Sequence, residues 1–363
     1  MKKVATVFGI LFAVFLVCFM ASVAATGVGD EGFRVSVYGL NGGLRLGGIS
    51  TKTYQAGEEY IANLAESETV KRIDLGIAAA RTTVKVEDTD MIGVYYKAGR
   101  SGIRFGCEIR NGTLIVREDA FFWTFFDFGG DPSELELILP AREYEKIVLS
   151  AASGEIKADD LVCEKFSAEV ASGSGDFTLY AREIDLDAAS GKIVIGNCSP
   201  EKPPVKSINI DCASGSHTVR GFAAEKFDVD LASGNVTLED ISGKGDIDLA
   251  SGVVKLVYAD WNDDLTVDAT SGTVEVLLPA GSGAWVECDA ASGGVTSMLD
   301  NDSHYFSRDG NGYVGGENRH RVDVDIASGE VRLANRADEI KPEPQENPPS
   351  EESDDVPPDE AAE

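Results

Sequence analysis

Residues 229–238 read VDLASGNVTL, and residues 247–256 repeat the same template as IDLASGVVKL. In both copies apolar residues alternate with polar ones, so the apolar side chains would share one face of a strand. An Ala-Ser-Gly tripeptide interrupts this alternation. Alanine keeps the inside of a bend free of bulk, and glycine adopts backbone angles that other residues reach only with strain. The template therefore predicts two short strands joined at a tight corner.

The Ser-Gly pair recurs along most of the chain. It starts at Ser153, Ser172, Ser190, Ser214, Ser233, Ser251, Ser271, Ser292 and Ser328, with successive gaps of 19, 18, 24, 19, 18, 20, 21 and 36 residues. One such unit cannot bury its own apolar face, whereas stacked units bury a continuous core. The repeat predicts an all-β fold, a single-stranded β-solenoid or β-helix with coils of about 19 residues. A β-sandwich is the competing fold, but it does not require the same corner tripeptide nine times.

Two long gaps predict insertions, which in solenoids form loops, often on a binding face. Residues 197–206 fill the 24-residue gap, and residues 300–321 fill most of the 36-residue gap as a long loop or a cap. Before the first Ser-Gly pair, strands are expected in five segments: 73–75, 83–86, 93–96, 114–116 and 135–140.

The N-terminus carries an export pattern. Lys2 and Lys3 precede an uncharged apolar run over residues 4–25, which is typical of a signal peptide and also long enough for a membrane anchor. We therefore expect an extracytoplasmic protein, either membrane-anchored by this segment or secreted.

Four regions are expected in the chain. Residues 1–27 are the signal peptide or anchor, 28–69 a linker or loosely packed segment, 70–336 the solenoid domain, and 337–363 a tail. The tail combines 11 acidic residues and 6 prolines with few large apolar residues, a composition that predicts disorder.

The chain is strongly acidic, with 62 acidic and 32 basic residues and a formal net charge of −30. Nucleic acid would be repelled, which excludes a basic nucleic-acid binder. In seven repeats an aspartate stands three residues before the serine: Asp187, Asp211, Asp230, Asp248, Asp268, Asp289 and Asp325. Stacked coils would place these carboxylates about 5 Å apart, where like charges repel.

Two interpretations of this aspartate column stay open. Calcium could offset the repulsion, because it takes clustered carboxylates and carbonyls, although the nonapeptide of known calcium solenoids is missing. The alternative is a solvated acidic face that aids solubility and prevents sideways aggregation.

No residue is assigned a catalytic, cofactor-binding or metal-binding role. A nucleophilic serine needs a nearby base, and only His217, His304 and His320 are available. His217 occupies a normally apolar strand position and is interpreted as a packed ring. A glycosidase needs one pair of carboxylates in unlike environments, whereas here the pair repeats on most coils. We therefore predict that the protein is not an enzyme and needs no cofactor.

Five cysteines follow the N-terminal segment, an odd number at irregular spacing that fits no disulfide framework and no zinc motif. Cys212 and Cys288 occupy apolar positions of the repeat and are interpreted as small buried hydrophobes. One pair among Cys107, Cys163 and Cys198 could oxidise outside the cell, and the sequence leaves this open.

An aromatic segment has two interpretations as well. It is either a plug that covers a solenoid end or an exposed patch for a partner, a glycan or a membrane. Its six aromatic residues are Phe121, Phe122, Trp123, Phe125, Phe126 and Phe128.

The whole pattern resembles the putative-adhesin family of bacterial exported proteins, a β-solenoid domain of unknown function. The resemblance covers about residues 70–335 and rests on EIRNGTLIV (108–116), ELELILPAREYEKIVLSAASGEI (134–156) and the Ser-Gly series through VDIASGEVRL (324–333). It implies a non-enzymatic, adhesin-like binding module of the cell envelope.

The partner is expected to be an unknown surface ligand, protein or glycan, and not nucleic acid, with membrane association offered by the N-terminal segment. Two alternatives stay open for the function. One is an extracytoplasmic polysaccharide-active enzyme on a β-helix scaffold, and the other an accessory or sensor component of an envelope-stress system.

Overall fold

The computed structural model describes residues 49–65, 69–119 and 131–336. These ranges contain 25 β-strands and one short 3-10 helix, η3 (Leu299–Asn301), which confirms the all-β class. The predicted signal or anchor, the tail and the aromatic segment 121–128 lie outside the described residues. Of the segments that the structure describes, none is a helix with the length and hydropathy that a membrane crossing requires.

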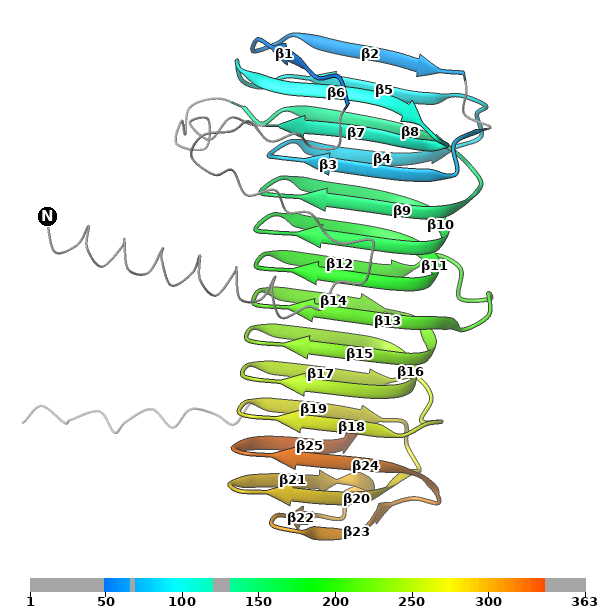
Figure 1. Cartoon of the computed structure of the whole chain (residues 1–363). Helices are drawn as coiled ribbons and strands as arrows, with labels where there is room; N and C mark the ends of the chain where they lie inside the picture. The colour runs from blue at the N-terminus through cyan, green and yellow to red at the C-terminus, as the bar shows by residue number, and fades with distance from the viewer. Residues whose placement is uncertain (1–48, 66–68, 120–130, 337–363) are drawn as a thin grey trace, which may run out of the picture.

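The strands form two layers that face each other across the core (Figure 1). Layer A contains, in spatial order, β1 (Lys52–Tyr54), β6 (Ile103–Arg110), β7 (Thr113–Asp119), β3 (Arg72–Ile77), β9 (Glu143–Ala151), the second parts of β10 (Glu155–Val170) and β11 (Ser174–Ala188), β13 (Val205–Cys212), β15 (Ala223–Leu231), the second part of β16 (Asn235–Leu249), β18 (Leu265–Ala269), β24 (Asn318–Ile326), β20 (Ser282–Ala290) and β23 (Gly310–Gly315).

Layer B faces layer A and, in the middle region, consists of the strands that follow the Ala-Ser-Gly corners. It contains β2 (Glu59–Leu64), β5 (Ile92–Lys97), β8 (Glu134–Pro140), β4 (Arg81–Glu87), the first parts of β10 and β11, β12 (Lys192–Asn197), β14 (Ser216–Arg220), the first part of β16, β17 (Val253–Tyr258), β19 (Thr273–Leu278), β25 (Gly329–Asn335), β21 (Gly293–Met298) and β22 (His304–Phe306).

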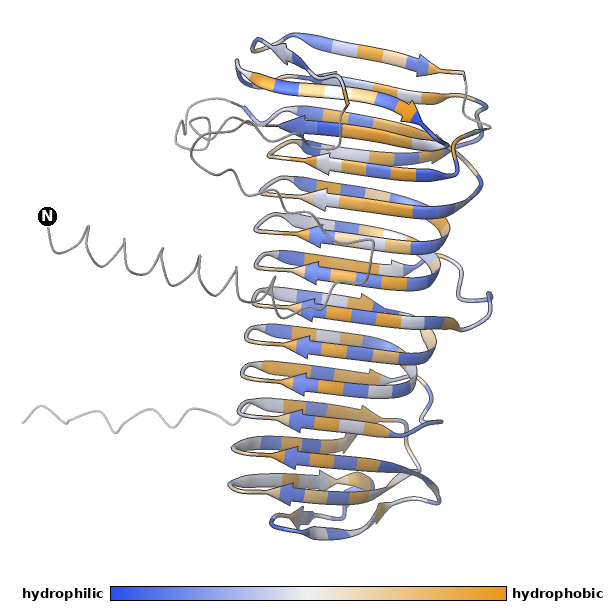
Figure 2. Cartoon of the chain, viewed as in Figure 1, coloured by the Kyte–Doolittle hydropathy of each residue, from blue (hydrophilic) through white to orange (hydrophobic). Residues whose placement is uncertain are grey.

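Each coil of the middle region runs along layer A, turns at Ala-Ser-Gly and returns in layer B. The apolar positions of the template face the interior, where Val229, Leu231, Val236 and Leu238 each keep at most 2% of their surface exposed. Burying one side chain of this size stabilises a fold by about 1.5–3 kcal/mol. Figure 2 shows the resulting alternation of hydrophobic and hydrophilic residues along the strands.

The corners stack in a line because their backbones are in direct contact. Gly252 has a φ of +108°, and a Cβ there would lie 2.3 Å from the carbonyl oxygen of Gly234 in the preceding coil. Serine hydroxyls bind the same edge: Ser214 Oγ donates to the carbonyl oxygen of Ala189 at 3.1 Å, and Ser172 Oγ to that of Ala152 at 3.2 Å. The corner tripeptide thus joins one coil to the next.

The order of the coils differs from the expectation that each coil lies on the preceding one. At the C-terminal end, β24 pairs in parallel with both β18 and β20, so the last coil (318–335) lies between coils 265–278 and 282–298 (Figure 1). At the N-terminal end, β3 pairs with both β7 and β9. In the C-terminal region the chain passes over one coil position and forms coil 282–298 and the cap strands. It then returns, and coil 318–335 occupies the open position.

Antiparallel strands close both ends of the stack. Residues 300–321, expected as a loop or a cap, contain β22 and β23, which form a cap by pairing antiparallel with β21 and β20, and residues 318–321 begin β24 of the last coil. Residues 28–69, expected as a linker or loosely packed segment, contain β1 and β2 in their described part, and these strands pair antiparallel with β6 and β5. The sequence signal is weak here because β2 lies at the edge of the fold, with Ile61 left 61% exposed.

Candidate functional site

The seven predicted aspartates lie in one line on the outside of layer A, which confirms that they form a column. Glu169 extends it at one end, so that the sequence pattern missed one member. In spatial order this first acidic column is Glu169, Asp187, Asp211, Asp230, Asp248, Asp268, Asp325 and Asp289. Neighbouring members lie one coil apart, about 4.8 Å.

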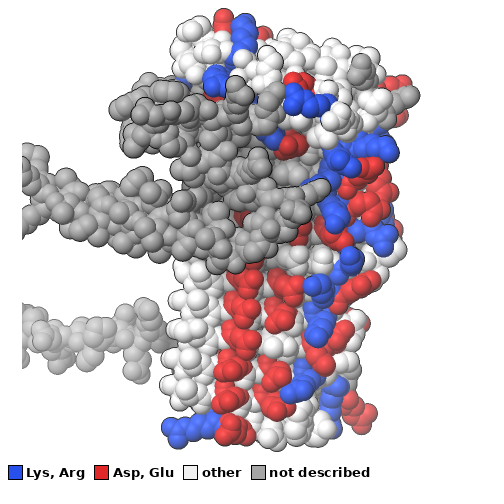
Figure 3. All heavy atoms as spheres, viewed as in Figure 1, with Lys and Arg blue, Asp and Glu red and all other residues white. Residues whose placement is uncertain are grey.

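A second acidic column runs beside the first, two residues earlier in each strand (Figure 3). Its members are Asp185, Asn209, Asp228, Asp246, Thr266, Asp323 and Glu287. This second column was not predicted from the sequence, although four repeats carry the signal Asp-x-Asp, as in residues 228–230. We call the two columns together the acidic ladder.

Basic residues border the ladder on the side of the second column (Figure 3). Lys165 and Lys206 both pair with Glu183, at 2.7 and 2.8 Å, and their hydrogen bonds lower the pKa of Glu183 to about 2. Lys226 pairs with Asp228 at 3.1 Å. The Lys226 pair therefore offsets part of the charge of the second column.

Among the residues that the structure describes, the charge of the first column is not offset by ion pairs of this kind. Loss of water within the groove raises the pKa of Asp187 to about 6, and the nearby carboxylates of Glu169 and Asp185 add to the effect. The pKa values of Asp211, Asp230 and Asp248 are also raised, first by desolvation and then by their acidic neighbours. Asp230 is within hydrogen-bonding reach of both Asp211 and Asp248, and such a bond between carboxyl groups needs a shared proton.

The ladder also lines a groove of about 510 Å³ in the middle of layer A. Its lining residues are Lys146, Ser167, Glu169, Asp185, Leu186, Asp187, Asn209, Ile210, Asp211, Asp228, Val229, Asp230, Asp246 and Asp248. Within the described ranges, no three His, Cys, Asp or Glu residues are grouped so that they could hold a metal ion. The calcium interpretation of the column therefore gains no support from the geometry.

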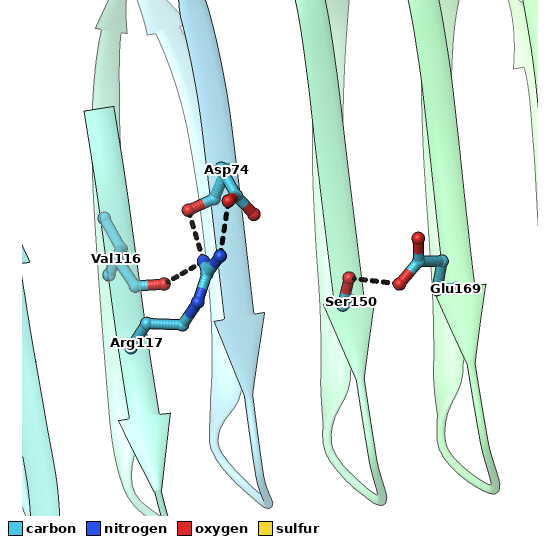
Figure 4. A network of polar contacts seen from close by, with 5 residues as sticks. All are labelled: Asp74, Val116, Arg117, Ser150 and Glu169. Atoms are coloured by element: carbon cyan, nitrogen blue, oxygen red, sulfur yellow. Dashed lines mark hydrogen bonds and ion pairs between the residues drawn. The ribbon is translucent and has the colours of Figure 1, made fainter. Parts of the chain in front are cut away.

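At the N-terminal end of the ladder, polar contacts replace the carboxylate repeat (Figure 4). Ser150 donates a hydrogen bond to Glu169 Oε2 at 2.9 Å. Further along layer A, Arg117 forms an ion pair with Asp74 and donates to the carbonyl oxygens of Asp74 and Val116 at 2.7 and 3.0 Å. The row of carboxylates in the ladder therefore ends at Glu169, and beyond it the Ser150 hydroxyl and the Arg117 guanidinium make the polar contacts.

The histidines and serines are engaged in structural contacts. His217 is buried, as interpreted from its strand position, and its Nε2 lies 3.1 Å from the carbonyl oxygen of Ser214. His304 pairs with Asp302 at 2.9 Å, and the ring of His320 packs edge-on against Trp261. Serine hydroxyls at the corners donate to backbone carbonyls of the neighbouring coil.

The five cysteines of the described chain are all free, including the three whose pairing the sequence left open. Cys212 and Cys288 are buried in apolar positions, as predicted from the repeat. Burial raises the pKa of the Cys163 and Cys212 thiols to about 12, so both stay protonated at neutral pH.

The stacked coils define an all-β repeat protein with long, regular outer faces. A family model described as Toastrack DUF4097 matches residues 70–334, and the chain belongs to this family of domains of unknown function. The family resemblance stated from the sequence is thereby confirmed.

The solved structures to which the chain is similar include putative adhesins and a putative lipid binding protein. A putative adhesin from Parabacteroides distasonis is 11% identical, with 76% of this chain and 97% of that chain covered and a TM-score of 0.45. A putative adhesin from Parabacteroides merdae is 10% identical, with 77% and 97% covered and a TM-score of 0.41. A putative lipid binding protein from Parabacteroides distasonis is 9% identical, with 80% and 97% covered and a TM-score of 0.32. At these values the likenesses carry no functional argument, and no curated protein matches the chain.

Proposed function

We propose that this chain is a non-enzymatic, exported module of the bacterial cell envelope that binds a surface partner in the manner of an adhesin. Repetition is the observation that carries the proposal. An active site requires titratable groups held in unlike environments, whereas the ladder presents the same carboxylates on coil after coil. Such a surface suits a partner that is itself extended.

The chemistry of the ladder favours a cationic partner. Neighbouring carboxylates raise one another's pKa, so bringing positive charge to the face relieves repulsion that the free protein carries. Complementary charge also steers the encounter and rejects partners of like charge. The raised pKa values thus support binding of a polycation or a positively charged surface.

The test compares the full chain with a ladder variant, Asp211→Asn combined with Asp230→Asn and Asp248→Asn. Binding is measured on surfaces that carry cationic, neutral or anionic groups over a series of salt concentrations. The wild-type chain should prefer the cationic surface, and the ladder variant should bind it about tenfold more weakly, with a shallower salt dependence.

The matched control is Glu134→Gln combined with Glu225→Gln and Glu317→Gln, which removes the same charge from exposed positions outside the ladder. It should bind like the wild type. Equal loss in both variants would reduce the effect to net charge and reject the ladder as the binding face. In a separate incubation of the wild-type chain with glycans, release of sugar products would instead establish an enzyme.

A further inference from the structure

We propose that the C-terminal cap carries a second binding surface, an aromatic platform for a carbohydrate chain without negative charge. The platform consists of Trp285 on β20, Tyr313 on β23 and Arg319 on β24. Trp285 and Tyr313 are directly opposite in the antiparallel pair, with ring centroids 4.5 Å apart. The Arg319 guanidinium lies 4.6 Å from the centroid of the Tyr313 ring.

The two rings are not part of the core of the cap. Strand alternation sends their neighbours Ala284, Val286 and Val314 inward, where each is at most 3% exposed. Tyr313 points outward and remains 59% exposed despite its contacts with Trp285 and Arg319. Aromatic rings that the fold does not use, gathered at one place on a surface, indicate a contact site for a ligand.

Hydrogen-bonding groups border the rings and are held in place. Glu287 lies opposite Asn311 on one side and Asp323 on the other. Arg321 fixes both carboxylates, pairing with Glu287 at 2.7 Å and with Asp323 at 3.1 Å. The two rings are inclined by 60° to one another, so a ligand stacks on one ring face at a time. A pyranose ring has an apolar C–H face and a rim of hydroxyls, so it matches an aromatic face bordered by carboxylate, amide and guanidinium groups.

The surroundings distinguish a sugar from other occupants. Protein interfaces have a buried centre that is poor in charged residues, whereas charged side chains flank these two rings directly. The acidic ladder continues up to Asp289 and Glu287 at this end, so an anionic sugar chain would be repelled. A chain of uncharged sugars or amino sugars can bind among charged side chains and is not repelled by the ladder.

The experiment measures binding of the full chain to immobilised oligomers of glucose, mannose, galactose and N-acetylglucosamine, with oligogalacturonate as the anionic comparison. At least one uncharged oligomer should bind, and Trp285→Ala combined with Tyr313→Ala should weaken that binding about tenfold or more. Trp285→Tyr and Tyr313→Phe keep a ring at each position and should retain most of the affinity.

The matched control is Tyr305→Ala, because Tyr305 is 63% exposed in the same cap but lies on β22 in layer B. It should leave binding unchanged, and thermal unfolding confirms that each variant is folded. Absence of binding to every uncharged oligomer, binding to oligogalacturonate alone, or equal loss in the Tyr305 control would overturn the platform. The ladder variant should keep its sugar binding, so failure of the proposed cationic partner and failure of the platform are distinguishable.

Discussion

A single glycine at each corner holds the coils at their close spacing. The repeat made this position conspicuous, and the sequence alone predicted a residue that tolerates unusual backbone angles. It could not show the second reason for glycine, which is the carbonyl oxygen of the preceding coil at 2.3 Å from the missing Cβ. That contact exists only between stacked corners.

Gly252→Ala should therefore cost more than the positive φ alone. We expect a loss of about 2–4 kcal/mol in the free energy of unfolding, measured with urea. The control is Gly281→Ala, where φ is +78° but no heavy atom lies within 4 Å of the added Cβ. Its cost should stay near 1 kcal/mol. Equal costs would show that the corners are not in contact.

At the scale of the strand, the alternation of apolar and polar residues predicted which side chains point inward and which point outward. It did not predict which side chains of other strands lie next to them. The first acidic column followed from aligned repeats, because in-register stacking places equivalent residues side by side. The second column needed only the same argument applied two residues earlier. The edge strand β2 could not be recognised, since a strand that covers the end of a stack leaves residues such as Ile61 exposed.

The ladder should make stability depend on pH. The folded-state pKa of Asp187 is raised from 3.8 to about 6, so the folded chain binds a proton more tightly than the unfolded chain. Its contribution to stability is fully present below about pH 4 and is lost as the pH rises through about 6. Because the Asp187 side chain keeps much of its surface in contact with water, solvent screening should hold the effect below about 1 kcal/mol.

Asp187→Asn isolates this contribution, since the neutral amide keeps the shape of the side chain without its charge. The variant should melt up to about 2 °C higher than the wild type at about pH 7.5, and the gain should shrink towards about pH 5. Asp260→Asn, at an exposed acid in the segment between β17 and β18, is the control. A gain that is independent of pH, or the same gain in the control, would contradict the electrostatic explanation.

For the whole molecule, the repeat predicted stacked coils but gave the wrong order at the ends. Alternation specifies which side chains face the core, and every coil shares that pattern, so it carries no information on which coil lies next to which. The order departs from the sequence order at the C-terminal end, where β22 and β23 pair antiparallel with β21 and β20 and the last coil lies between two coils that precede it in the chain. The order of the aspartates within the ladder depends on that arrangement, because Asp325 lies between Asp268 and Asp289 only when the last coil is inserted.

Cysteine cross-linking of the inserted coil tests this arrangement most directly. Thr266 is paired with Asp323 in the structure, whereas a stack in sequence order would pair Thr266 with Glu287. Thr266→Cys with Asp323→Cys places the two thiols on adjacent strands, within reach of a disulfide, while Thr266→Cys with Glu287→Cys places them two strands apart, about 9.6 Å. Peptide mapping after mild oxidation should find the disulfide in the first variant and not in the second. A disulfide in the second variant alone would contradict the inserted coil and the order Asp268, Asp325, Asp289 within the ladder.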